Sequence, residues 1–183
     1  MFKINIFRFD YFAIFDLDEV IIPKNHSNWA EMITYLESEE PQENREQRAA
    51  YTFDPVYFND NMQDNKSNDT NNDVPSYMHM MRHVYRSPPH KFNGKSIVSS
   101  KHVLIPHVHT PLTCLGDTSC LLYPVNEHIG DLHHYRFECS YYNPWCKELE
   151  QNLSEDTYIW RWKEEVIHGT TDTLSSLGFF NKR

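Results

Sequence analysis

Apolar residues dominate residues 11–23, and three acids interrupt them. The segment reads YFAIFDLDEVIIP, is rich in aromatic and β-branched residues and ends at Pro23, so it predicts a buried strand. Side chains alternate along a strand, so we expect Asp16 and Asp18 on one face and Glu19 on the other. Carboxylates inside a buried strand are costly unless a cation or a hydrogen-bond donor meets them. The pattern therefore predicts a hard-cation site at Asp16 and Asp18.

An amphipathic helix is predicted directly after this segment. Its apolar residues recur at i, i+3, i+4 and i+7, namely Trp29, Met32, Ile33 and Leu36. Ser27 or Asn28 is expected to cap the first turn, with Glu31 at the position of a capping-box acid. Pro41 ends this helix at the latest.

Shorter apolar runs predict further strands, at residues 51–53, 95–98, 103–105 and 121–125. Further helices are predicted between and after them. Residues 42–50 are charged and favour a short surface helix, and the apolar spacing over residues 77–84 favours a core helix. Near the end, Ser154 is expected to cap a helix that Gly169 closes, and a second short helix ends before Gly178. Strands and helices that follow one another in this way predict an α/β fold.

Residues 59–73 consist largely of Asn and Asp and have no periodicity, which predicts a flexible loop. The chain of 183 residues is long enough for one domain with a real core, so we expect residues 1–183 to form a single domain that contains this loop.

Charge narrows the possible functions. The formal net charge is −9, but residues 37–73 hold ten acids against three bases, and the remainder holds sixteen against fourteen. No basic stripe is present, which argues against a nucleic-acid-binding protein. No apolar run reaches the length of a membrane span, and charged residues make the N-terminal segment a poor signal peptide.

Two features nevertheless favour a secretory origin. The four cysteines form two close pairs, Cys114 with Cys120 and Cys139 with Cys146, and local disulfides are the pairing that we favour. Zinc ligation ranks below disulfides or free thiols, because the pairs are spaced more widely than in typical zinc sites. Four Asn-x-Ser/Thr sequons occur, at Asn25, Asn65, Asn68 and Asn152, although an Asn-rich chain also produces sequons by chance.

One enzyme class with an Asp-x-Asp string is the haloacid dehalogenase-like phosphatases. The string Asp-Leu-Asp-Glu-Val at residues 16–20 fits their motif, with Asp16 as nucleophile, Asp18 as acid/base and Lys95 as the charge-balancing lysine. The late acidic pair of that class is missing, since Asp117 is followed by Thr118, Ser119 and Cys120.

A second family fits more of the chain. FDLDEVIIPKNHSNWAEMITYL closely resembles the metal-binding segment of family 92 glycosyltransferases. The resemblance continues through residues 51–53 with Phe58, the Lys-Ser-Ile-Val strand at residues 95–98, Val103 with His109, and the His-Tyr-Arg of residues 134–136. It covers residues 12–137 in the right order, so the match is specific.

The resemblance implies a fold and an activity. The fold would be the C-terminal part of a nucleotide-diphospho-sugar transferase domain of the GT-A-like type, with a mixed sheet and flanking helices. The activity would be inverting, metal-dependent transfer of a hexose, galactose from UDP-galactose, to a glycan acceptor. Full-length relatives would be single-pass, membrane-anchored proteins of the Golgi lumen.

It also implies roles for individual residues. Asp18 would coordinate Mn²⁺ or Mg²⁺ directly, Asp16 would do so directly or through water and the ribose, and His109 would complete the site. His134 and Arg136 would bind the nucleotide, with Arg136 as a phosphate clamp. The alternatives are that His109 is a surface histidine and that His134 and Arg136 form a structural cluster. The acceptor also needs a general base, for which position alone suggests Glu127 and Asp131.

The start of the chain departs from the family. Only eleven residues precede Phe12, whereas family members carry a long nucleotide-binding segment before this strand. We therefore expect a partial domain with an apolar edge around Phe12, Ile14 and Ile21, and weak nucleotide binding. A non-enzymatic remnant is the third hypothesis, beside the transferase and the phosphatase.

Overall fold

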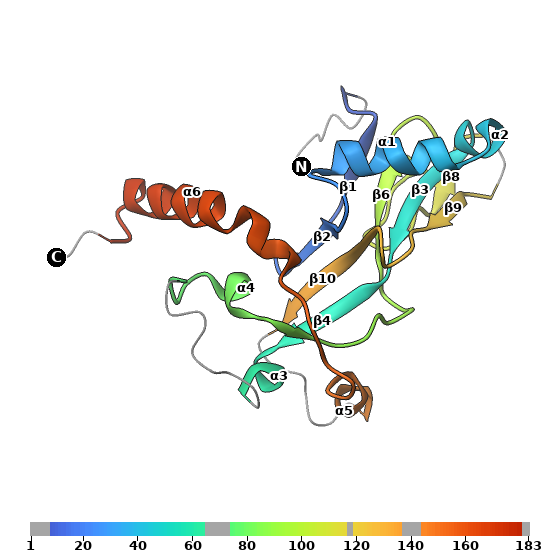
Figure 1. Ribbon diagram of the computed structural model, residues 1–183. Helices are drawn as coiled ribbons and strands as arrows, with labels where there is room; N and C mark the ends of the chain where they lie inside the picture. The colour runs from blue at the N-terminus through green and yellow to red at the C-terminus, as the bar shows by residue number, and fades with distance from the viewer. Residues whose placement is uncertain (1–7, 65–73, 117–118, 137–143, 181–183) are drawn as a thin grey trace. The chain divides into compact units, whose positions relative to one another are not determined.

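The computed structural model describes residues 8–64, 74–116, 119–136 and 144–180 (Figure 1). The chain divides into two compact units, Met1–Tyr57 with Pro89–His134 and Phe58–Pro88 with Tyr135–Arg183. No helix among the described residues is long and apolar enough to cross a membrane.

The first unit contains a mixed four-stranded sheet in the order β1-β6-β3-β9. Its strands are β1 (Tyr11–Ala13), β6 (Lys95–Ser99), β3 (Arg48–Phe53) and β9 (Leu121–Pro124). The β1–β6 and β3–β6 pairs are antiparallel, and β3–β9 is parallel. The predictions of an α/β fold and a mixed sheet are confirmed.

Helix α1 (Trp29–Glu39) covers this sheet, as Figure 1 shows. Met32, Ile33 and Leu36 lie in one core with Tyr51 and Phe53 of β3. The predicted cap is present: the Asn28 side chain accepts a hydrogen bond from the Glu31 N–H at 2.9 Å, and the Glu31 carboxylate accepts from the N–H of Ser27, the residue before the cap.

Helix α2 (Gln42–Arg45) is shorter than the predicted helix of residues 42–50, because β3 begins at Arg48. The Arg48 side chain is buried and forms an ion pair with Glu40, so the charge that suggested a surface helix is satisfied inside the unit.

Residues 11–23 form two strands, so the prediction of one continuous strand is wrong. β1 belongs to the four-stranded sheet, whereas β2 (Glu19–Pro23) belongs to a three-stranded sheet of order β2-β10-β4. That sheet also contains β10 (Gly130–Arg136) and β4 (Pro55–Asn59). The physical reason is the acidic interruption: the Glu19 N–H donates to the Asp16 carbonyl at 3.2 Å and closes a turn.

The expected apolar edge is only partly present. Ile14 is exposed and Phe12 half-buried, but Ile21 is buried, because it pairs with Leu132 of β10 and belongs to the core. The Trp29 indole N–H also donates to the Ile21 carbonyl at 2.9 Å, which fastens α1 to β2.

A hairpin of β7 (Val103–Ile105) and β8 (Thr113–Cys114) completes the first unit. The predicted Cys114–Cys120 disulfide is present, with its Cα atoms 5.4 Å apart. Cys146 is also disulfide-bonded. The other half of the second predicted pair, Cys139, lies outside the described residues.

The second unit contains short elements and one longer helix. They are α3 (Asp60–Asp64), α4 (His79–Arg82), β5 (Tyr85–Arg86), α5 (Pro144–Leu149), β11 (Ser154–Glu155), a 3₁₀ helix (Tyr158–Trp162) and α6 (Lys163–Ser176). Of the loop predicted at residues 59–73, Asn59 ends β4 and residues 60–64 form α3, whereas residues 65–73 lie outside the described part of the chain.

Two helix predictions for the second unit are wrong in their bounds. The helix expected over residues 77–84 is only the four residues of α4. Ser154 caps no helix, because it lies in β11 and pairs with Arg86 of β5. Gly169 lies inside α6, where a Cβ atom would meet no neighbour within 4 Å.

Replacing Leu36 by Ala should lower the free energy of unfolding by about 2–5 kcal/mol, because Leu36 is fully buried in the core beneath α1. Leu112→Ala is the control: Leu112 is exposed in the same unit, and its loss should change stability by about 0.5 kcal/mol at most. Urea denaturation measures both values, and equal losses would contradict the placement of Leu36.

Candidate functional site

The turn between β1 and β2 presents the acids. The Asp16 N–H donates to the Glu19 carboxylate at 3.1 Å, and the Glu19 N–H donates back to the Asp16 carbonyl. Leu17 at the tip is fully exposed. The side chains of Asp16 and Asp18 are 62% and 46% exposed, whereas that of Glu19 is buried. Two carboxylates therefore face solvent from a turn, and the third points into the protein.

Lys95 is the buried cation that meets these acids. Its Nζ lies 2.9 Å from Asp16 Oδ2 and 3.1 Å from Glu19 Oε2. Lys95 is the first residue of β6 and pairs with Phe53 of β3. A buried ammonium is tolerated only with such partners. Hydrogen bonding to Lys95, followed by its positive charge, lowers the pKa of Asp16, so Asp16 is held as a carboxylate.

Gly94 allows Lys95 to enter the sheet at this point. A Cβ atom on Gly94 would collide with the carbonyl oxygen of Phe53, so this close approach of two backbones requires glycine.

His134 joins the other end of the acidic turn. It pairs with Glu19 in the antiparallel register of β10 and β2. Its Nε2 lies 3.3 Å from Asp18 Oδ2, and its Nδ1 lies 3.4 Å from Glu19 Oε1. We call Asp16, Asp18, Glu19, Lys95 and His134 the carboxylate network, because ion pairs connect all five side chains.

His109 lies beside the same network but is held by the backbone. Its Nδ1 is 3.0 Å from the Gly94 carbonyl, and the Ser96 hydroxyl donates to the His109 carbonyl at 2.5 Å. After the larger effects of Lys95 and then His134, the charge of His109 also lowers the pKa of Asp16. His109 is thus near Asp16, and His134 is the histidine that contacts Asp18.

Of the two suggested general bases, one lies on β10 and the other in the turn before it. Glu127 is exposed in the turn before β10. Asp131 is buried on the strand, with Lys24 Nζ at 2.7 Å and His133 Nε2 at 3.2 Å. Burial alone would raise the pKa of Asp131, but the hydrogen bond and charge of His133, together with Lys24, outweigh it and lower the pKa. Asp131 lies three positions before His134 on the strand, which corresponds to a distance of roughly 10 Å.

Arg136, suggested as a phosphate clamp, ends β10 and belongs to the second unit. The other suggested nucleotide ligand, His134, belongs to the first.

Sequence reasoning missed part of this arrangement. The role of Glu19 as the shared partner of Lys95 and His134 was not foreseen, because a strand would have turned it away from the two aspartates. The available signal was Lys95 itself: a lysine that opens an apolar strand, Lys-Ser-Ile-Val, requires a buried acid nearby.

Glu19→Gln should lower the free energy of unfolding by about 3 kcal/mol or more, because it removes the buried negative charge beside the Lys95 ammonium and leaves only the solvent-exposed carboxylate of Asp16 to balance it. Asp16→Asn should cost about 1 kcal/mol at most, since Asp16 is mostly exposed. Asp10→Asn is the control for Asp16→Asn, because it breaks an ion pair between two exposed side chains, Asp10 and Lys101. Chemical denaturation of the three variants measures the difference, and a Glu19→Gln loss no larger than that of Asp16→Asn would contradict it.

Lys95→Met should raise the pKa of Asp16 toward its ordinary value of about 3.9, because the hydrogen bond and charge that lower it are removed. Lys24→Met, which removes a different buried partner, should leave the pKa of Asp16 unchanged and raise that of Asp131. Carboxyl ¹³C NMR titration measures both shifts.

The lowered pKa of Asp16 determines how the stability of the protein changes with pH. The stabilisation from the Asp16–Lys95 pair is fully present above the ordinary pKa of aspartate and is lost as the pH falls through the lowered value. An Asp16 that titrates identically with and without Lys95 would contradict the contact.

The comparisons with known proteins identify the family of the chain. No match to the sequence is found among curated proteins. Residues 5–173 match glycosyltransferase family 92, a span that contains all five residues of the carboxylate network and most of both units. The chain therefore belongs to glycosyltransferase family 92 and is a transferase by family.

Proposed function

We propose that this protein transfers a hexose, galactose from UDP-galactose, to a hydroxyl group of a glycan acceptor, with inversion and with a bound Mn²⁺ or Mg²⁺ ion. The carboxylate network carries the proposal. Two half-exposed aspartates lie on one turn, where one contacts a buried lysine and the other a histidine, and the chain belongs to a glycosyltransferase family. The donor would be the nucleotide sugar, and the acceptor a glycan.

The side-chain atoms of the carboxylate network that could bind a metal suit Mn²⁺ or Mg²⁺. Hard divalent cations take carboxylate oxygens, and imidazole nitrogen is compatible with manganese. Asp18 and His134 present a carboxylate oxygen and a ring nitrogen 3.3 Å apart, so they are the residues that would hold the ion. This replaces His109 by His134 as the histidine ligand. When bound, the ion would neutralise charge that develops on the diphosphate as the sugar leaves.

The remaining residues of the network orient these two. Glu19 Oε1 lies 3.4 Å from Nδ1 of His134 and so orients the imidazole ring, whose Nε2 faces Asp18. Lys95 keeps Asp16 ionised, so Asp16 can accept hydrogen bonds from ribose hydroxyls. The buried pair of Lys95 and Glu19 thereby fixes both ends of the acidic turn.

An inverting transfer also needs a group that deprotonates the acceptor hydroxyl. Of the two residues suggested by sequence, Asp131 is enclosed in an ion pair with Lys24, whereas Glu127 is exposed. Glu127 is therefore the better candidate for the base.

The location that we propose is the Golgi lumen, with membrane anchoring in full-length relatives. The Cys114–Cys120 disulfide supports an oxidising compartment. The sequon residues Asn25 and Asn152 are exposed, as glycosylation there would require.

One observation also fits the phosphatase alternative, namely the contact of Lys95 with Asp16, which that chemistry would use to balance charge at the nucleophile. Sugar transfer and phosphate release are separable, so one set of variants tests both hypotheses.

Asp18→Asn and His134→Ala should each weaken manganese-dependent UDP binding and lower galactose transfer by about 10–100-fold or more, because each removes a proposed ligand. His109→Ala should have a clearly smaller effect, and Asp10→Asn, an exposed ion-paired aspartate in the same unit, should have none. Calorimetry with UDP and transfer from radiolabelled UDP-galactose to a glycan mixture measure the two quantities.

A generic phosphate ester is the control substrate. Phosphate release that Asp16→Asn abolishes, without sugar transfer, would establish the phosphatase instead. If the protein shows no turnover of either substrate and no manganese-dependent UDP binding, it is a non-enzymatic remnant.

A further inference from the structure

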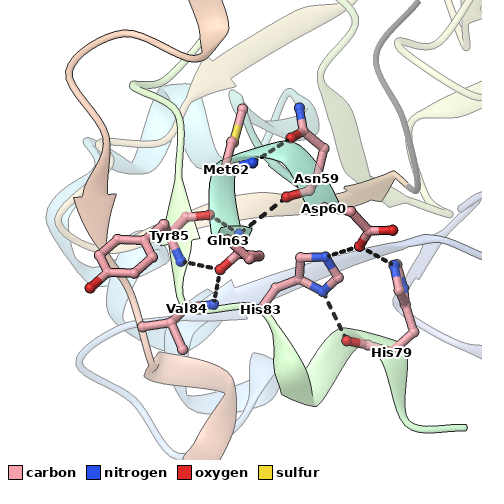
Figure 2. Close-up of polar contacts among 8 residues, drawn as sticks. All are labelled: Asn59, Asp60, Met62, Gln63, His79, His83, Val84 and Tyr85. Atoms are coloured by element: carbon pink, nitrogen blue, oxygen red, sulfur yellow. Dashed lines mark hydrogen bonds and ion pairs between the residues drawn. The ribbon is translucent and has the colours of Figure 1, made fainter. Parts of the chain in front are cut away.

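The second unit holds a separate cluster of possible metal ligands, formed by Asp60, His79 and His83 (Figure 2). Asp60 is the first residue of α3, His79 the first residue of α4, and His83 the residue that caps the end of α4. One ligand atom from each of the three lies within 4.8 Å of the other two. His83 Nε2 is 2.8 Å and His79 Nε2 is 3.8 Å from the same oxygen, Asp60 Oδ1.

The two histidines stand one helical turn apart. An i, i+4 pair of histidines on a helix faces one side and is a known way to present two imidazoles to zinc. The rings of His79 and His83 lie 4.4 Å apart, centroid to centroid, at 70° to each other, and both are directed toward Asp60 in Figure 2.

The hydrogen bonds of His83 define what its second nitrogen can bind. Nδ1 lies 2.9 Å from the His79 carbonyl oxygen, which can only accept, so Nδ1 carries a proton. Nε2 faces a carboxylate oxygen, which also only accepts. Either a second proton or a metal cation must therefore lie between Nε2 and Asp60. A backbone carbonyl on the far nitrogen is also the usual way in which a metal-binding histidine is oriented.

Gln63 fixes the two ligand-bearing segments relative to each other. Its side-chain oxygen accepts from the N–H groups of Val84 and Tyr85, both at 2.9 Å, and its nitrogen donates to the Tyr85 and Asn59 carbonyls. Asn59 caps α3 by accepting from the Met62 N–H at 3.0 Å. As Figure 2 shows, α3 and the chain just after His83 are held together by contacts that involve none of the three ligand atoms.

The cluster is buried on one side and open on the other. His83 is 3% exposed, His79 24% and Asp60 49%. Both imidazole rings pack edge-on against Tyr135, which is buried and stacks on Phe58 at 4.6 Å. Three protein ligands with an apolar wall behind them and solvent in front leave room for water as a fourth ligand, as in open zinc sites.

We propose that Asp60, His79 and His83 bind one divalent transition-metal ion, with Zn²⁺ as the preferred ion. Two imidazoles and one carboxylate favour zinc and its neighbours over the oxygen-seeking Mg²⁺. The ion joins α3 to α4 and is independent of the transferase site, which uses a different set of residues in the other unit.

Titration of the chelator-treated full chain with Co²⁺ tests this, because four-coordinate Co²⁺ has strong visible absorption bands. We expect one Co²⁺ per chain with these bands, displaced by Zn²⁺, and an upward shift of the unfolding midpoint when Zn²⁺ is added. Asp60→Asn and His83→Asn should each weaken binding by at least about tenfold, since even the loss of a ligand's hydrogen-bond partner costs about that much. The bands should persist in Asp18→Asn, which removes the proposed ligand of the other site.

His168→Asn is the matched control, because His168 forms an exposed pair with Asp172 on α6, with Nδ1 3.2 Å from the carboxylate, and its loss should leave Co²⁺ binding unchanged. If His83→Asn fails to fold, Asp60→Asn decides, since the half-exposed Asp60 side chain can change to an amide at the surface. Binding that is absent, or equal in wild type, Asp60→Asn and His83→Asn, would overturn the proposal and leave His83 and Asp60 as an ion pair only.

Discussion

The buried ammonium of Lys95 is the interaction on which the first unit depends. It is enclosed at the start of β6, and its partners Glu19 and Asp16 lie at the two ends of the turn between β1 and β2. Because an unpaired buried charge is strongly destabilising, the lysine requires this turn, and the turn positions Asp18 beside His134. A structural need of the core and the chemical need of the site are therefore met by the same side chains.

The parts of the fold that local sequence determines were predictable. Helix α1 has apolar spacing, a capping asparagine and a capping-box glutamate within a few residues, and all three signals agree. Residues 11–23 were not predictable in the same way. An apolar run indicates burial, but it does not tell whether one strand or two strands of different sheets are buried, and that choice depends on partners far along the chain, β6 and β10.

The candidate site was also predictable only in part from the sequence. The acidic pair was identified from residue type, because carboxylates amid apolar residues need a cation. Which histidine meets Asp18 follows from the register of β10 on β2, which places His134 opposite Glu19, and no spacing in the sequence encodes that register. The cluster of Asp60, His79 and His83 was missed because the methionines between the histidines suggested an ordinary core helix, and the aspartate lay in a segment interpreted as a loop.

The pairing of β2 with β10 has a consequence for how the first unit folds. Glu19 lies near the start of the unit and His134 at its end, so the pairing of these strands closes a loop that contains nearly all residues of the unit. Such non-local pairing makes folding slow, because the entropy of a long loop is lost before any contact compensates for it. Among the described strands, β2 pairs only with β10. Until β10 has left the ribosome during synthesis, the apolar residues of β2 therefore stay available to chaperones or to other chains. The acidic turn at its start opposes such association, since charges beside an unpaired strand discourage edge-to-edge contact.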